Sequence, residues 1–114
     1  RRDVLLGSYD SAMNERLPIP IPHEEIAAFC RRNHIRKLSL FGSVLRDDFT
    51  AESDVDVLVE FEEGTRIGLI GFARLQRELE SLIGRRVDLN TPMSLSPSFR
   101  GEVLGEARAL HVAA

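Results

Sequence analysis

Several features that would place a chain in a specialised class are absent from these 114 residues. Cys30 is the only cysteine, so an internal disulfide is excluded and a reducing compartment, the cytoplasm, is expected. No apolar run approaches the roughly 20 residues of a membrane-spanning helix, and no stretch resembles a secretory signal. We therefore expect no membrane association. The three histidines, His23, His34 and His111, lack metal-ligand spacing, which argues against a zinc site.

An excess of positive charge is also absent. The net charge is -3, whereas proteins that bind nucleic acid directly usually present a basic surface. We therefore expect no direct contact with nucleic acid. The acidic residues are concentrated in one part of the chain, because residues 46–63 contain eight acidic side chains and one basic side chain.

The length predicts a single domain of about residues 23–114, preceded by a leader over residues 1–22. The chain opens with Arg rather than Met, so its start is either a cloning remnant or a truncation. Met13 as the native start, with Ser11 and Ala12 ending a cloning scar, is one hypothesis. Alternate prolines over residues 17–22 predict an extended segment that leads into a helix.

The hydrophobic periodicity predicts an α/β (α+β) fold, with a small mixed sheet and helices packed mainly on one face. Ile67, Leu69 and Ile70 are either extra core or an exposed patch. Each of the two later helices is expected to face the core with one apolar stripe. The stripe of the longest helix consists of Phe72, Leu75, Leu79 and Leu82, and the stripe of the last helix consists of Phe99, Val103, Leu104 and Ala107. The expected elements are helices over residues 23–33, 43–47, 67–83 and 97–108, strands over 35–41, 54–62 and 85–91, and a final strand or frayed end over 110–114.

The motif that carries chemistry is a Gly42-Ser43 pair, ten further residues, and then Asp54-Val55-Asp56. Strand side chains alternate between faces, so Asp54 and Asp56 share one face, about 7 Å apart. Carboxylates placed in this way can hold divalent metal ions. Asp88, on a neighbouring predicted strand, is expected to join them. A Gly-Ser turn can present N–H groups and a hydroxyl to phosphate. The pattern therefore predicts a metal-dependent nucleotide site.

Each of these residues also has an ordinary interpretation. Asp54 and Asp56 could form the solvent face of an alternating strand, and Asp88 could be an exposed strand residue. A Gly-Ser pair is often only a turn. Arg46 on a short helix is as consistent with a surface salt bridge as with a phosphate contact. A bare acidic loop repels a triphosphate, and bound Mg²⁺ would reverse the sign of that argument.

The combined pattern resembles the polymerase-β-like nucleotidyltransferase superfamily, and in particular its minimal members, the MNT proteins. MNT proteins are the antitoxin halves of HEPN/MNT toxin–antitoxin pairs. The resemblance covers about residues 23–110. The segments that carry it are Leu40–Asp47 (LFGSVLRD), Ser53–Phe61 (SDVDVLVEF) and Gly84–Leu89 (GRRVDL).

The resemblance implies specific roles. Asp54, Asp56 and Asp88 would be the catalytic carboxylates and the ligands of two Mg²⁺ ions, with Asp88 assisting deprotonation of the attacking hydroxyl. Gly42, Ser43 and Arg46 would contact the phosphates of ATP. The implied reaction transfers AMP to a tyrosine hydroxyl of a partner HEPN ribonuclease toxin and silences the toxin. The sequence does not fix the oligomeric state, and a homo- or hetero-oligomer is an open alternative.

Two alternatives remain at this point. A non-catalytic antitoxin could neutralise its toxin by covering the toxin's active site. Transfer to a small molecule such as an aminoglycoside would normally need an added acceptor-binding domain, and the sequence shows none. The base of the nucleotide is not fixed by any identifiable residue.

Overall fold

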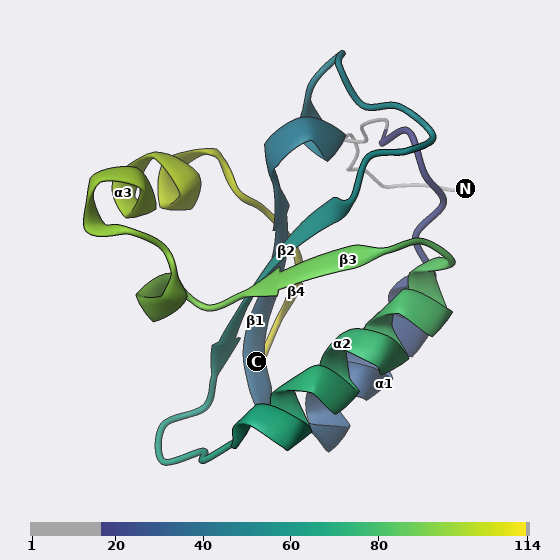
Figure 1. The fold of residues 1–114 in the computed structure, drawn as a ribbon. Helices are drawn as coiled ribbons and strands as arrows, with labels where there is room; N and C mark the ends of the chain where they lie inside the picture. Colours follow the sequence, from purple (N-terminus) through teal and green to yellow (C-terminus); the bar gives the residue numbers. More distant parts are fainter. Residues whose placement is uncertain (1–16, 114) are drawn as a thin grey trace, which may run out of the picture.

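The computed structural model describes residues 17–113, which form a four-stranded mixed sheet covered by helices (Figure 1). The strands lie side by side in the order β3-β2-β1-β4. β1 is antiparallel to both β2 and β4, and β2 is parallel to β3. The mixed sheet expected from the sequence is therefore confirmed. The strands are β1 (Ile35–Phe41), β2 (Val55–Phe61), β3 (Val87–Asn90) and β4 (Arg108–Val112).

Of the three α-helices that the structure describes, two cover one face of the sheet, and the third lies on the opposite side (Figure 1). α1 and α2 pack together, and an ion pair between Arg32 and Glu78 joins them. This arrangement confirms the prediction that the helices pack mainly on one face of the sheet. The helices are α1 (His23–Arg32), α2 (Leu69–Ile83) and α3 (Pro97–Glu106), and the short 3₁₀ helices are η1 (Gly42–Leu45) and η2 (Pro92–Ser94).

The main hydrophobic core lies between the sheet and the α1–α2 pair. It forms because apolar residues alternate along the strands and recur every three or four residues along the helices, so that both present one apolar side. Ile19 of the preceding segment is buried in the same core. Its central members are Ile26, Phe29 and Cys30 from α1, Leu38 and Leu40 from β1, Val55, Val57 and Val59 from β2, and Leu75, Leu79 and Ile83 from α2.

A smaller core lies on the other face of the sheet, beneath α3. It consists of Phe41, Leu58, Leu95 and Val103, with Ala107 packed against it. The expectation that Phe99 and Leu104 point inward is wrong, since they are 45% and 47% exposed. The apolar area beneath α3 is small, and α3 contacts it mainly through one buried residue, Val103. The other apolar residues of the expected stripe therefore have no apolar surface to pack against.

Several element limits differ from those expected. The segment after β1 is the 3₁₀ turn η1 rather than a helix over residues 43–47. α3 ends at Glu106, because the chain then pairs with β1 as strand β4. Of the two alternatives for the C-terminal end, a final strand or a frayed end, the strand is therefore correct up to Val112. α2 begins at Leu69, and its first turn is an exposed patch, with Leu69 90% and Ile70 75% exposed.

Residues 1–16, including the proposed start at Met13, lie outside the described part of the chain, as does Ala114. Within residues 17–113, no helix combines the length and apolar composition needed to cross a membrane.

Candidate active site

The carboxylates predicted to act together lie on β2, just before it, and on β3. Parallel pairing of the two strands places Asp56 directly beside Asp88. Their neighbours Val55, Val57 and Leu89 are buried in the main core, so the two aspartates point to the opposite face. The alternation read from the sequence therefore gave the correct face for both residues.

Asp56 and Asp88 are close enough to form a side-chain hydrogen bond. Partial burial of Asp56, followed by the negative charges of Asp88 and Asp54 and by this hydrogen bond, raises its pKa to about 6, while nearby Arg46 opposes the shift. A hydrogen bond between two carboxyl groups needs a shared proton. At neutral pH, above the Asp56 pKa of about 6, that proton is largely lost, and the two adjacent negative charges favour a cation.

Asp54 is directed elsewhere. Its Oδ1 atom lies 3.0 Å from Nε of Arg86, and Arg86 also donates a hydrogen bond from Nη2 to the backbone oxygen of Glu52, at 3.0 Å. Across residues 17–113, no three His, Cys, Asp or Glu side chains are gathered as a ready metal-ligand group. The structure thus brings Asp56 and Asp88 together but leaves Asp54 paired with Arg86.

The residues present fit a divalent cation such as Mg²⁺. Carboxylate oxygens are the hard ligands that Mg²⁺ prefers. The Asp56–Asp88 pair places two carboxyl groups side by side, where a cation could neutralise both. Asp54 could add a third carboxylate once it exchanges Arg86 for the cation.

The Gly-Ser turn packs directly against this pair. Gly42 has a φ of +79°, and a Cβ atom at this position would overlap Oδ2 of Asp56. Only glycine fits here without strain and without moving the carboxylate. A hydrogen bond of 2.9 Å from the Arg46 backbone N–H to the Ser43 backbone oxygen closes the turn. The two halves of the sequence motif are therefore in contact.

Glu106, the last residue of α3, belongs to the same site and was not predicted. Its Oε2 atom accepts a hydrogen bond of 3.2 Å from the Gly42 backbone N–H, and its Oε1 atom lies 3.7 Å from Nη1 of Arg46. Nε of Arg46 also lies 3.7 Å from Oδ1 of Asp48. Because 64 residues separate Glu106 from Gly42, no local pattern in the sequence could have revealed this contact.

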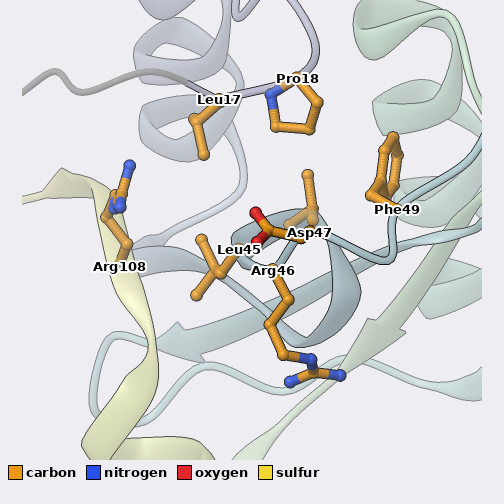
Figure 2. A pocket seen from close by; sticks show the side chains of 8 residues that line it. Leu17, Pro18, Leu45, Arg46, Asp47, Phe49 and Arg108 are labelled. Carbon is orange, nitrogen blue, oxygen red and sulfur yellow. The ribbon is translucent and has the colours of Figure 1, made fainter.

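A cavity of about 370 Å³ adjoins the turn. Figure 2 shows that Arg46 extends away from Leu17 and Pro18, which lie on the far side of the cavity. The lining residues of the cavity are Leu17, Pro18, Val44, Leu45, Arg46, Asp47, Phe49 and Arg108.

The mixed sheet, the carboxylate pair and the adjoining turn are the features expected of a nucleotidyltransferase. Residues 23–110 match the model of the nucleotidyltransferase domain family, and the chain belongs to this family. Protein adenylyltransferase MntA of Thermococcus cleftensis is 42% identical over 72 residues, which are 63% of this chain and 71% of that protein. MJ0435 of Methanocaldococcus jannaschii is 38% identical over 76 residues, 67% of this chain and 80% of that one.

Several solved structures are also similar to this chain. One described as a minimal nucleotidyltransferase shares 41% identity at a TM-score of 0.63, over 75% of this chain and 86% of that chain. A toxin–antitoxin complex with AMP-PNP shares 23% identity at a TM-score of 0.66, over 82% and 75%. A complex of tri-AMPylated HEPN toxin with MNT antitoxin from Shewanella oneidensis shares 24% identity at 0.58, over 80% and 70%. The last two likenesses concern the fold.

Proposed function

We propose that this chain is a Mg²⁺-dependent adenylyltransferase that moves AMP from ATP to a tyrosine hydroxyl of a HEPN ribonuclease toxin, and so acts as its antitoxin. The observation that carries the proposal is the Asp56–Asp88 carboxyl pair packed against the Gly42 turn. It places candidate metal ligands beside candidate phosphate ligands. The relative named as a protein adenylyltransferase, and the neighbouring complexes that contain a nucleotide analogue or an AMPylated HEPN toxin, support the same assignment.

In this proposal the hydrogen-bond donors bind the phosphates, and the carboxylates bind the metal and the acceptor proton. The Gly42 N–H, the Ser43 hydroxyl and the Arg46 guanidinium bind the β- and γ-phosphates and orient the triphosphate. Asp54, Asp56 and Asp88 would hold Mg²⁺, which would supply positive charge to neutralise the phosphates. Asp88 accepts the proton of the acceptor hydroxyl. The hydroxyl oxygen forms a bond to the α-phosphorus, and the bond from that phosphorus to the leaving pyrophosphate breaks.

The decisive experiment measures the mass of the candidate toxin. The chain is mixed with the HEPN partner, ATP and Mg²⁺, and the partner is weighed by intact mass spectrometry. Asp54→Asn/Asp56→Asn is the test variant, because it removes charge with little change in shape. Glu63→Gln, an exposed carboxylate in the turn after β2, is the matched control. We expect one or more AMP units with the original chain and the control, and none with the double variant.

The opposite outcome is equally informative. If the toxin gains no mass, yet its ribonuclease activity is inhibited even by the double variant, the chain is an antitoxin that acts by binding alone. Tandem mass spectrometry of the modified toxin identifies the acceptor residue, and modification elsewhere than tyrosine would correct that part of the proposal. Fractionation of the host cell tests the predicted cytoplasmic location.

A further inference from the structure

We infer that Glu106 is a positioning residue that occupies the phosphate-binding groups of the resting enzyme and must leave them when a triphosphate binds. This inference rests on the proposed function, because it concerns the same Gly42 turn. It assigns to the end of α3 a role in nucleotide binding.

The contacts of Glu106 carry the inference. Its two carboxylate oxygens engage two different groups, the Gly42 backbone N–H at 3.2 Å and the Arg46 guanidinium at 3.7 Å. These are two of the three groups assigned to the phosphates. A carboxylate and a phosphate use the same donors, since both present anionic oxygens to N–H groups. Glu106 therefore holds the groups that a triphosphate would use.

The position of Glu106 allows it to leave. Its side chain is 33% exposed, and it ends a helix whose packing on the sheet depends on Val103, one turn earlier. Swinging the carboxylate into water would leave that apolar contact intact. Glu106 and a triphosphate also repel one another, so their simultaneous presence at Gly42 is unfavourable. Nucleotide binding should consequently loosen the last turn of α3.

A purely structural role makes the opposite prediction. If Glu106 only holds the turn in shape, removing its charge should disorder Gly42 and weaken nucleotide binding. If Glu106 competes with phosphate, removing the charge should strengthen binding. The sign of the change in affinity therefore separates the two roles.

The test is titration calorimetry with AMP-PNP and Mg²⁺, without any protein acceptor. Glu106→Gln keeps the size of the side chain and removes its charge, and we expect the Kd to fall about threefold to tenfold. Glu106→Ala should give a change of the same sign. Glu102→Gln, an exposed carboxylate on the same helix, is the matched control and should leave the Kd unchanged.

Amide exchange followed by NMR gives a second readout. In the original chain, AMP-PNP should accelerate exchange over residues 103–107 and shift the Gly42 amide signal. In Glu106→Gln the exchange should already be fast and respond little to nucleotide. These responses depend on release of the carboxylate rather than on stability alone.

The outcomes distinguish the two proposals. If the original chain binds AMP-PNP and Glu106→Gln binds it equally or more weakly, the role of Glu106 is overturned while the proposed function stands. If neither protein binds AMP-PNP, the proposed function fails and this inference fails with it. Binding by Glu106→Gln that exceeds that of the original chain supports both.

Discussion

Gly42 and Asp56 explain why the two halves of the motif belong together. Phe41, the last residue of β1, is the antiparallel partner of Asp56 on β2. The residue after Phe41 therefore lies beside the Asp56 carboxylate, and that residue has no room for a side chain. The ten residues between Ser43 and Asp54 form the connection that brings β2 back into this register. The β1–β2 pairing thus brings the two halves of the motif together.

Replacement of this glycine by alanine should be costly. Gly42→Ala places a Cβ at positive φ and against Asp56, so we expect the free energy of unfolding to fall by about 2–3 kcal/mol. Gly64 also has a positive φ, of 85°, but nothing lies within 4 Å of its added Cβ. Gly64→Ala is therefore the matched control and should cost about 1 kcal/mol. Urea unfolding measures both.

A double-mutant cycle separates the clash from the backbone strain. In an Asp56→Ala background the added Cβ of Gly42→Ala meets no carboxylate, so its cost should approach that of Gly64→Ala. An undiminished cost in that background would show that contact with Asp56 is not the reason glycine is required.

For single residues, the sequence predicted the face of the sheet to which a strand side chain points. It did not predict side-chain contacts between residues far apart in the chain. The shared face of Asp56 and Asp88 followed from their strand positions and is confirmed. Pairing of Asp54 with Arg86, and of Gly42 with Glu106, depends on how separate elements pack. Such side chains look like ordinary surface charges until their partners are located.

Among the elements, α2 and α3 show when a helical hydrophobic period correctly predicts which residues are buried. The expected stripe of α2 is largely correct, since Leu75 and Leu79 are buried and Phe72 and Leu82 are partly buried against the core. The stripe expected on α3 is wrong, because that helix covers a face of the sheet that also carries the charged site. A period predicts burial only where the underlying surface is apolar.

Two leucines of α2 provide a matched comparison of this point. Leu79 is fully buried between the helices and the sheet, so Leu79→Ala should lower the free energy of unfolding by about 2–5 kcal/mol. Leu69 is 90% exposed in the first turn, and Leu69→Ala should change it by no more than about 0.5 kcal/mol. Thermal and urea unfolding of both variants test this directly. A large loss for Leu69→Ala would mean that the exposed patch is covered in solution.

For the whole molecule, the sheet separates two environments. One face and its two helices form the main core, which contains most of the buried apolar residues. The other face carries the small core beneath α3, together with the carboxylates and the Gly42 turn. The fold therefore bears the cost of holding Asp56 partly buried beside Asp88. That cost should be measurable as a dependence of global stability on pH.

Asp56 should make the metal-free protein less stable as pH rises. Its folded pKa of about 6 lies above the ordinary 3.8, so the folded state retains a proton that the unfolded state loses. The stabilising contribution is complete below about pH 4 and disappears as pH rises through about 6. After allowance for partial exposure, we expect a loss of about 1–2 kcal/mol relative to Asp56→Asn, which does not titrate in this range. Urea unfolding in chelator at several pH values measures the difference.

Addition of Mg²⁺ at pH 7.5 should reverse this effect in the original chain, because the cation replaces the lost proton between Asp56 and Asp88. Mass action predicts a gain of about 2.7 kcal/mol when the Mg²⁺ concentration is one hundred times its Kd. Asp56→Asn should gain much less, and Glu63→Gln should respond like the original chain. Equal stabilisation of all three proteins would place the Mg²⁺ away from this pair and contradict its assignment as the metal site.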